Sequence, residues 1–285
     1  MAAPSAGIPA IHRIVPDSGQ QVTKLTRYQL REYLRSRRFL ALLGIVIIIG
    51  VILSAVVGHF RGALVSNHLA FYGSFWGGGV YLVIVLSAVF FGGDAIAGEF
   101  QNKTGYFLMG LPIRRSTVYV AKFIAAFLAS TAMVLVFLLI LVGNGAYYFG
   151  GGLFPWQLAL SLVLAIVYLA AVLGATFLFS SLFKTSAYGF VLTAILFLFG
   201  FTILEALVSG LVKIEPWMVI SYAQSTIGGV FSSTANWGLS GSPCTGDFCA
   251  SPYTAGIGEG IVIMIAYFLV TAVVGLLLFE REEFN

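Results

Sequence analysis

Residues 39–57 read FLALLGIVIIIGVILSAVV, a stretch of nineteen residues without a charged side chain. A helix rises 1.5 Å per residue, so this stretch covers about 28 Å, close to the ~30 Å hydrocarbon thickness of a bilayer. A transmembrane β-strand needs only about 10 residues with alternating polarity, a pattern that is absent here. The stretch is therefore predicted to form a membrane-spanning helix.

Five further apolar runs of similar length follow it. Of the 285 residues, 59% are hydrophobic and 9% are charged, against about 25% charged residues in soluble domains. A soluble globule of this size could not bury so much apolar surface. The sequence therefore predicts an all-α integral membrane protein with six spans, at residues 39–57, 75–97, 123–142, 157–183, 189–208 and 260–279.

The basic residues predict the orientation of these spans. If the N-terminus is cytosolic, thirteen of the fifteen Lys and Arg residues lie on the cytosolic side, and only Arg61 and Lys213 lie on the other. Cytosolic loops of membrane proteins carry such an excess. We therefore expect a multi-pass protein of the cytoplasmic membrane with both termini in the cytosol. The net charge of +4 indicates contact with anionic membrane lipid rather than with nucleic acid.

The residues before the first span divide into two parts. Residues 1–21 contain three prolines among small residues and are expected to form a flexible tail. Residues 22–38 alternate basic and apolar side chains at helical spacing, which predicts an interfacial amphipathic helix on the cytosolic surface, a basic flank of the first span, or both. Residues 39–283 are then the transmembrane domain.

Small residues mark two of the spans. Gly50, Ser54 and Gly58 stand four apart in the first span, where they permit close approach of another helix, within the chain or in a second subunit. Glycines at both ends of the second span permit close packing or a local break. Asp94 follows at the predicted cytosolic boundary, and both a structural role and a contact with a partner are open to it.

The longest predicted loop, residues 209–257, lies outside the cytosol and contains both cysteines. We expect Cys244 and Cys249 to form a disulfide, because that compartment can be oxidising and no other thiol competes. A metal clip is the alternative, but no histidine lies nearby to complete it. No metal site is therefore predicted.

Catalytic motifs are missing from the sequence. It has no phosphate-binding loop, no Gly-x-Ser-x-Gly elbow and no zinc-binding pattern. The middles of the spans hold almost no ionisable groups, which proton- or sodium-coupled carriers need. We therefore expect a chain that is not an enzyme, carries no cofactor, and takes its energy from another protein.

The polar stretch between the second and third spans, residues 98–122, reads GEFQNKTGYFLMGLPIRRSTVYVAK. Pro112 cannot continue a helix and biases Leu111 away from helical angles, so a short helix is predicted before it. The charged residues either contact a cytosolic partner or are solvated loop residues.

Together with the six spans and the basic N-terminal helix, this stretch resembles the membrane subunits of ABC transporters of the ABC-2 type. The pattern of that family reads here as Glu99, Lys103-Thr104, Leu108 to Pro112, Arg114 or Arg115, and Lys122. Lys103-Thr104-Gly105 stands where Gly-Thr is more usual. The resemblance covers about residues 22–283.

The resemblance implies a cytosolic coupling helix within residues 98–115 that docks on a separate ATP-binding subunit. Two such subunits would hold ATP and Mg²⁺, and a second permease copy or a paralogue would complete the membrane half. The implied function is export of a lipid, polysaccharide, peptide or drug-like molecule. The implied docking residues are Glu99, Lys103, Thr104, Pro112, Arg114 and Arg115.

The fifth span is rich in phenylalanine. Phe197 and Phe201 either line a path for an apolar substrate or contact lipid and neighbouring helices, and Glu205 either pairs with Lys213 or helps to close the pathway. The alternative function is an ATP-independent carrier or a membrane anchoring or assembly protein. The sparse intramembrane charge argues against a carrier, and residues 98–122 argue against a passive anchor.

Overall fold

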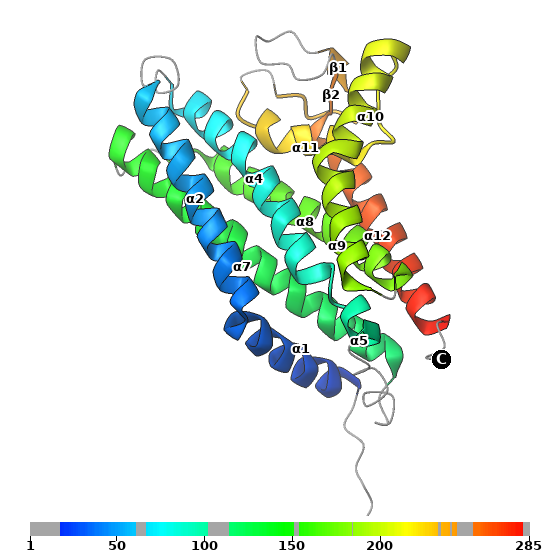
Figure 1. The fold of residues 1–285 in the computed structure, drawn as a ribbon. Coiled ribbons are helices and arrows are strands. Elements are labelled where there is room, and N and C mark those ends of the chain that lie inside the picture. Colours follow the sequence, from blue (N-terminus) through cyan, green and yellow to red (C-terminus); the bar gives the residue numbers. More distant parts are fainter. Residues whose placement is uncertain are drawn as a thin grey trace, which may run out of the picture.

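The computed structural model describes residues 18–60, 67–101, 114–150, 154–183, 185–232, 235–239, 241–243 and 253–281. Within these ranges, six helical segments are long and apolar enough to cross a membrane, and they pack side by side (Figure 1). The predicted class, an all-α integral membrane protein with six spans, is confirmed. In chain order the spans are α2 (Arg37–His59), α4 (His68–Gly92) with α5 (Ala97–Gln101), α7 (Arg115–Phe149), α8 (Trp156–Leu182), α9 (Ser186–Ile195) with α10 (Phe201–Leu207), and α12 (Ile257–Arg281).

Two of the spans differ in form from a plain helix of the predicted length. The third was predicted at residues 123–142, but α7 extends beyond both ends of that range. The fifth contains two π-helical segments, η1 (Leu196–Gly200) after α9 and η2 (Val208–Val212) after α10. A π-helical turn carries one extra residue, so it shifts the faces that a helix presents to its neighbours.

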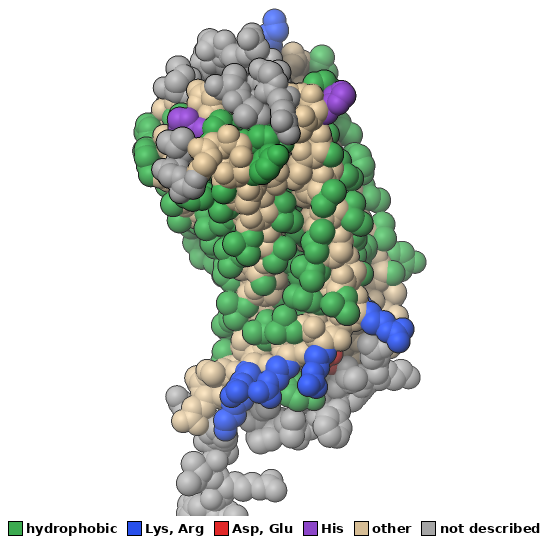
Figure 2. Space-filling model, turned by 90° about the vertical axis from the view of Figure 1, so that its left-hand side faces the viewer, with side chains coloured by type: hydrophobic (Ala, Val, Ile, Leu, Met, Phe, Trp, Pro, Cys, Tyr) green, Lys and Arg blue, Asp and Glu red, His purple; other side chains and the backbone are tan. Residues whose placement is uncertain are grey.

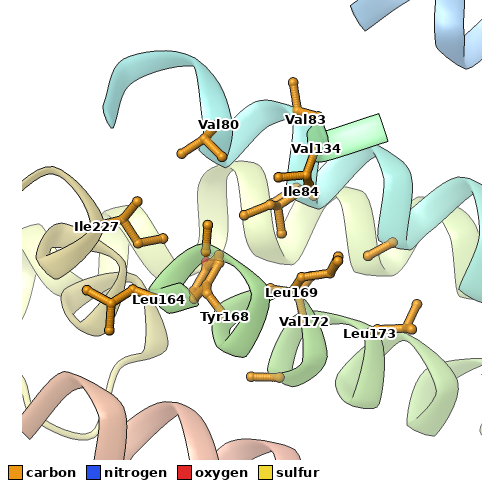
Figure 3. Packing of buried hydrophobic residues seen from close by; sticks show 14 of the residues in the cluster. Val80, Val83, Ile84, Val134, Leu164, Tyr168, Leu169, Val172, Leu173 and Ile227 are labelled. Atoms are coloured by element: carbon orange, nitrogen blue, oxygen red, sulfur yellow. The ribbon is translucent and has the colours of Figure 1, made fainter. Parts of the chain in front are cut away.

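The core lies mainly between α4 and α8, with α7 on one side. Val80, Val83 and Ile84 of α4 are fully buried, as are Leu169 and Val172 of α8 (Figure 3). Tight packing of such side chains is what associates helices in lipid, where apolar burial alone gives no preference. These two helices therefore lie at the centre of the bundle.

A chain of buried hydrogen bonds joins α4 and α8 to α11 (Ile220–Gly229). The indole Nε1 of Trp76 donates to Ser161 Oγ at 2.9 Å, and Ser161 Oγ donates to the carbonyl oxygen of Ile227 at 2.5 Å. α11 thus lies inside the predicted loop of residues 209–257 but packs against the bundle. The loop also contains the two-residue strands β1 (Ser242–Pro243) and β2 (Tyr253–Thr254), which pair antiparallel. Cys244 and Cys249 lie outside the described residues, so their disulfide stays a prediction.

The small residues of the first span pack within the chain. A Cβ on Gly50 would lie 2.8 Å from Ile140 Cδ1, and Ser54 Oγ accepts a hydrogen bond from Asn144 Nδ2 at 2.8 Å. α2 therefore uses this stripe to approach α7. The sequence left open whether this stripe packs within the chain or against a second subunit, and in the structure it packs within the chain.

α1 (Ser18–Arg35) crosses one end of the bundle and packs against α7 (Figure 1). It begins inside the predicted tail and ends before Ser36, whose Oγ caps α2 by accepting from the backbone N–H of Phe39 at 3.1 Å. Lys and Arg side chains gather at this end (Figure 2). We call it the basic end, defined by the exposed side chains of Lys24, Arg27, Arg31, Arg35, Arg37 and Arg38.

Candidate functional site

The second span breaks at the basic end, where α4 stops at Gly92 and α5 begins at Ala97. At this break two glycines allow the backbones of neighbouring helices to come very close. A Cβ on Gly93 would lie 3.2 Å from Phe190 Cα, and one on Gly189 would lie 3.2 Å from the carbonyl oxygen of Gly93. The end of α4 and the start of α9 are thus in direct backbone contact.

Ser180 of α8 satisfies the backbone groups that the break leaves open. Its Oγ accepts from the N–H groups of Ile96 at 3.1 Å and Ala97 at 3.0 Å, and it donates to the carbonyl oxygen of Gly93 at 3.1 Å. Ser180 is fully buried, so no water replaces these bonds at low cost. One hydroxyl therefore holds both sides of the break.

Lys122 of α7 holds the same segment from another side. Its Nζ donates to the carbonyl oxygen of Ala95 at 2.7 Å and to Glu99 Oε1 at 2.5 Å. The exposed fractions of the two side chains are 10% for Lys122 and 18% for Glu99. A buried ion pair needs good geometry and further hydrogen bonds to offset the loss of hydration, and the Ala95 carbonyl supplies one.

Two more contacts tie the ends of this region to the bundle. Gln101 Oε1, at the end of α5, accepts from the backbone N–H of Ser186 at 3.1 Å and from its hydroxyl at 2.6 Å. Arg115 Nη1, at the start of α7, donates to the carbonyl oxygen of Glu280 at 3.2 Å. The end of α5 is thus anchored on α9, and the start of α7 on α12.

α1 is attached to this region as well. The hydroxyl of Tyr33 donates to the carbonyl oxygen of Phe91 at 3.1 Å, and Thr26 Oγ1 donates to that of Ala121 at 3.3 Å. Burial raises the pKa of the Tyr33 hydroxyl, so it stays a neutral donor. α1 is therefore joined to both α4 and α7.

Asp94, inside the break, forms an ion pair with Arg38 at the start of α2. The exposed fractions are 60% for the Arg38 side chain and 28% for that of Asp94. The sequence left open a structural role or a contact with a partner for Asp94, and within the chain Asp94 has the structural role. Because the arginine is largely solvated, the pair adds little stability by itself.

The docking residues implied by the resemblance fall into two groups. Lys103, Thr104 and Pro112 lie outside the described residues. Of the others, Arg114 is exposed directly before α7, and Arg115 is half-buried. Glu99 is directed inward to Lys122, so within the chain it already has the charge partner that was expected from another protein.

The three residues suggested for a substrate path lie on successive turns of the fifth span. Phe197 is buried, and its ring centroid lies 5.0 Å from that of Phe201, which is half-buried. The carbonyl oxygen of Phe197 accepts a hydrogen bond from the Tyr81 hydroxyl. Glu205 is half-buried one helical turn further on, in α10. Phe197 thus packs against α4, and the substrate path stays a prediction.

Ser180, Gln101 and Tyr33 were not predicted. Ser180 is one of several hydroxyl residues in the fourth span, with Ser161, Thr176 and Ser181, so its only signal was a place near the predicted cytosolic end of that span. Gln101 and Tyr33 carried no comparable signal. Their roles depend on which helices become neighbours, and the sequence alone does not fix that.

Residues 25–284 match the family described as ABC-2 family transporter protein. The chain belongs to the ABC-2 transporter family. No curated protein matches it. The resemblance inferred from residues 22–283 is therefore confirmed, and so is the assignment as a membrane permease of an ABC transporter. In this ABC-2 permease, α5 ends and α7 begins within residues 98–122, the polar stretch on which the resemblance was based.

Proposed function

We propose that this permease is the membrane subunit of an ATP-driven exporter, with its basic end in the cytosol. A separate ATP-binding subunit, present in two copies and holding ATP and Mg²⁺, docks on residues 98–115. A second permease copy or a paralogue completes the pathway. The cargo is a lipid, polysaccharide, peptide or drug-like molecule, moved outward.

One observation carries the proposal. The two helix ends that flank residues 102–113 are held to several other helices: α5 and the break before it through Ser180, Lys122 and Gln101, and the start of α7 through Arg115. These anchors satisfy the backbone groups that the break leaves open, and they also join α5 to the spans. A segment that receives a push from a partner needs them, because the displacement must reach the spans.

The contacts give a route for that displacement. Movement of α5 acts on α7 through the Glu99–Lys122 pair, on α8 through Ser180, and on α9 through the hydrogen bonds between Gln101 and Ser186. Three spans would then respond to one push. α4 itself can bend at Gly93, where the helix is already interrupted.

Arg114 is the described residue best placed to meet the partner. It is exposed at the end of the segment, and its backbone is extended (φ −70°, ψ 142°) just before α7 begins. Lys103, Thr104 and Pro112 complete the proposed docking surface. Glu99 serves to position the segment rather than to bind the partner.

Co-purification tests the proposal. The tagged permease is expressed with candidate ATP-binding subunits, and the complex is assayed for ATP hydrolysis after reconstitution in vesicles. We expect one ATP-binding subunit to be recovered with the permease and its ATPase rate to change on association. Transport in vesicles without nucleotide would contradict the proposal and favour an ATP-independent carrier.

A further inference from the structure

A pocket of about 270 Å³ opens at the basic end and shares Ser186 with the contacts that hold α5. Its lining comes from the starts of α2 and α9 and from the end of α4, and consists of Arg38, Phe90, Asp94, Ser186, Ala187 and Phe190. α2 and α9 both pack on α4, which lies between them in Figure 1. The pocket therefore sits where the ends of three spans meet.

The two sides of the pocket differ in chemistry. One wall is aromatic, with the ring centroids of Phe90 and Phe190 5.3 Å apart and the rings at 70°. The rim carries the guanidinium of Arg38, whose side chain is 60% exposed although Nη1 contacts Asp94. A guanidinium has five N–H donors, so it can bind Asp94 and a phosphate oxygen at once.

An outward-facing strip of α4 continues from the pocket along the bundle. Gly78, Leu82, Leu86 and Phe90 follow one another at four-residue spacing, and each is exposed or half-buried. A Cβ on Gly78 would have no atom within 4 Å, so the space beside it is open. The strip is about 18 Å long at 1.5 Å per residue, slightly more than one leaflet of a ~30 Å hydrocarbon core.

The charge balance at the rim selects the kind of molecule that fits. Arg35 and Arg37 are exposed next to Arg38, whereas Asp94 is the one acidic residue among the described residues that line the pocket. A phosphate with one uncompensated negative charge complements this excess better than a zwitterionic headgroup. Attraction to a basic surface is worth about 1 kcal/mol per Lys or Arg.

We propose that this pocket binds one anionic membrane phospholipid, with its phosphate at Arg38 and an acyl chain along Phe190, Phe90 and the strip of α4. The site goes beyond the proposed export function, because a lipid can be bound here whether or not it is the cargo. Asp94 belongs both to the pocket and to the break in the second span. An occupied pocket would therefore touch the region proposed to transmit the push.

A tryptophan reporter tests the site. The four native tryptophans, Trp76, Trp156, Trp217 and Trp237, lie toward the other end of the bundle, so Phe190→Trp adds one indole at the basic end. The full-length variant is reconstituted in vesicles that contain phosphatidylglycerol or phosphatidylcholine brominated on the acyl chains. Bromine quenches only indoles that touch it, which separates a bound lipid chain from a bound free phosphate.

We expect brominated phosphatidylglycerol to be preferred about fivefold over brominated phosphatidylcholine at the indole introduced at position 190, which corresponds to about 1 kcal/mol. The matched control is Val191→Trp, because Val191 is exposed on α9 but does not line the pocket. At that position the two lipids should quench alike.

Two further variants, each combined with Phe190→Trp, change the net charge of the pocket in opposite directions. Arg38→Gln should remove the preference, and Asp94→Asn should increase it, because Arg38 then has no competing carboxylate. Equal quenching of the Phe190→Trp reporter by both lipids would show ordinary lipid contact and overturn the proposal. Absence of quenching by either lipid would show a protein surface over the pocket, such as a second copy, and would also overturn it.

Discussion

Lys122 and Glu99 lie 23 residues apart in the sequence, and in the fold the Lys122 Nζ stands 2.5 Å from Glu99 Oε1. The same nitrogen donates to the carbonyl oxygen of Ala95, inside the break of the second span. One cation of α7 thus fixes both the break and the short helix after it. The position of the proposed docking segment therefore depends on α7.

Removing the cation should be more harmful than neutralising its partner. Lys122→Met leaves the Glu99 carboxylate and the Ala95 carbonyl without their donor, and breaking a buried pair in this way costs about 3–5 kcal/mol. Glu99→Gln should cost less, because the amide oxygen still accepts from Nζ. The free energy of unfolding in mixed micelles, measured by denaturant titration, checks the order. An equal loss in both variants would contradict the role given to Ala95.

Ser180→Ala should destabilise the break, because the buried N–H groups of Ile96 and Ala97 lose their acceptor. Each unsatisfied group costs about 1–3 kcal/mol. Ser181→Ala is the control, since its buried hydroxyl donates only to the carbonyl oxygen of Leu178 within the same helix. Hydrogen exchange of the amides at residues 96–97 should accelerate in the first variant and not in the second. Unchanged exchange in Ser180→Ala would show that Ser180 does not hold the break in the second span.

Gly93→Ala should push α4 and α9 apart. The new methyl group would lie 2.7 Å from the Val89 carbonyl oxygen and 3.2 Å from Phe190 Cα, and overpacking of this kind costs about 1–3 kcal/mol. Gly78→Ala is the matched control, since a Cβ there has nothing within 4 Å. Thermal unfolding of the purified proteins compares the two. An unchanged melting temperature in Gly93→Ala would contradict this prediction, because it would show that α4 and α9 can separate at little cost.

Arg114→Glu should weaken the association with the ATP-binding subunit without harming the fold, because Arg114 is exposed. Like charges across an interface cost several kcal/mol, so recovery of the partner should fall by at least about tenfold. Arg37→Glu, an equally exposed reversal at the basic end but on α2, should leave recovery unchanged. If both reversals reduce recovery alike, the effect comes from the overall charge and not from a docking site.

The six spans were predictable because hydropathy and length alone determine them. The ends of the third span were not, since Lys122 and Asn144 interrupt its hydropathy and lie inside α7 only because the bundle provides partners for both. A single sequence does not show that Lys122 meets the Ala95 carbonyl. The same holds for α11, whose polar composition resembles a loop although Ile220 and Tyr222 are buried.

For the site, the sequence pointed to residues 98–122 and, for Glu99, to a different partner from the one it has in the fold. Its carboxylate was expected to face another protein because a charge beside a span normally faces water. The buried amine of Lys122 provides an alternative within the chain. Ser180 escaped prediction for a related reason, since a hydroxyl in a span more often bonds to its own helix, as Ser181 does.

Cysteine labelling at position 114 tests the central claim most directly, because that claim places residues 98–115 in the cytosol against a partner. Arg114→Cys is made in a chain whose Cys244 and Cys249 are replaced by serine, with Trp237→Cys, exposed at the opposite end, as the reference. A membrane-impermeant maleimide should label position 237 in intact cells and position 114 only after permeabilisation. The bound ATP-binding subunit should then protect position 114. Labelling of position 114 in intact cells would contradict the account.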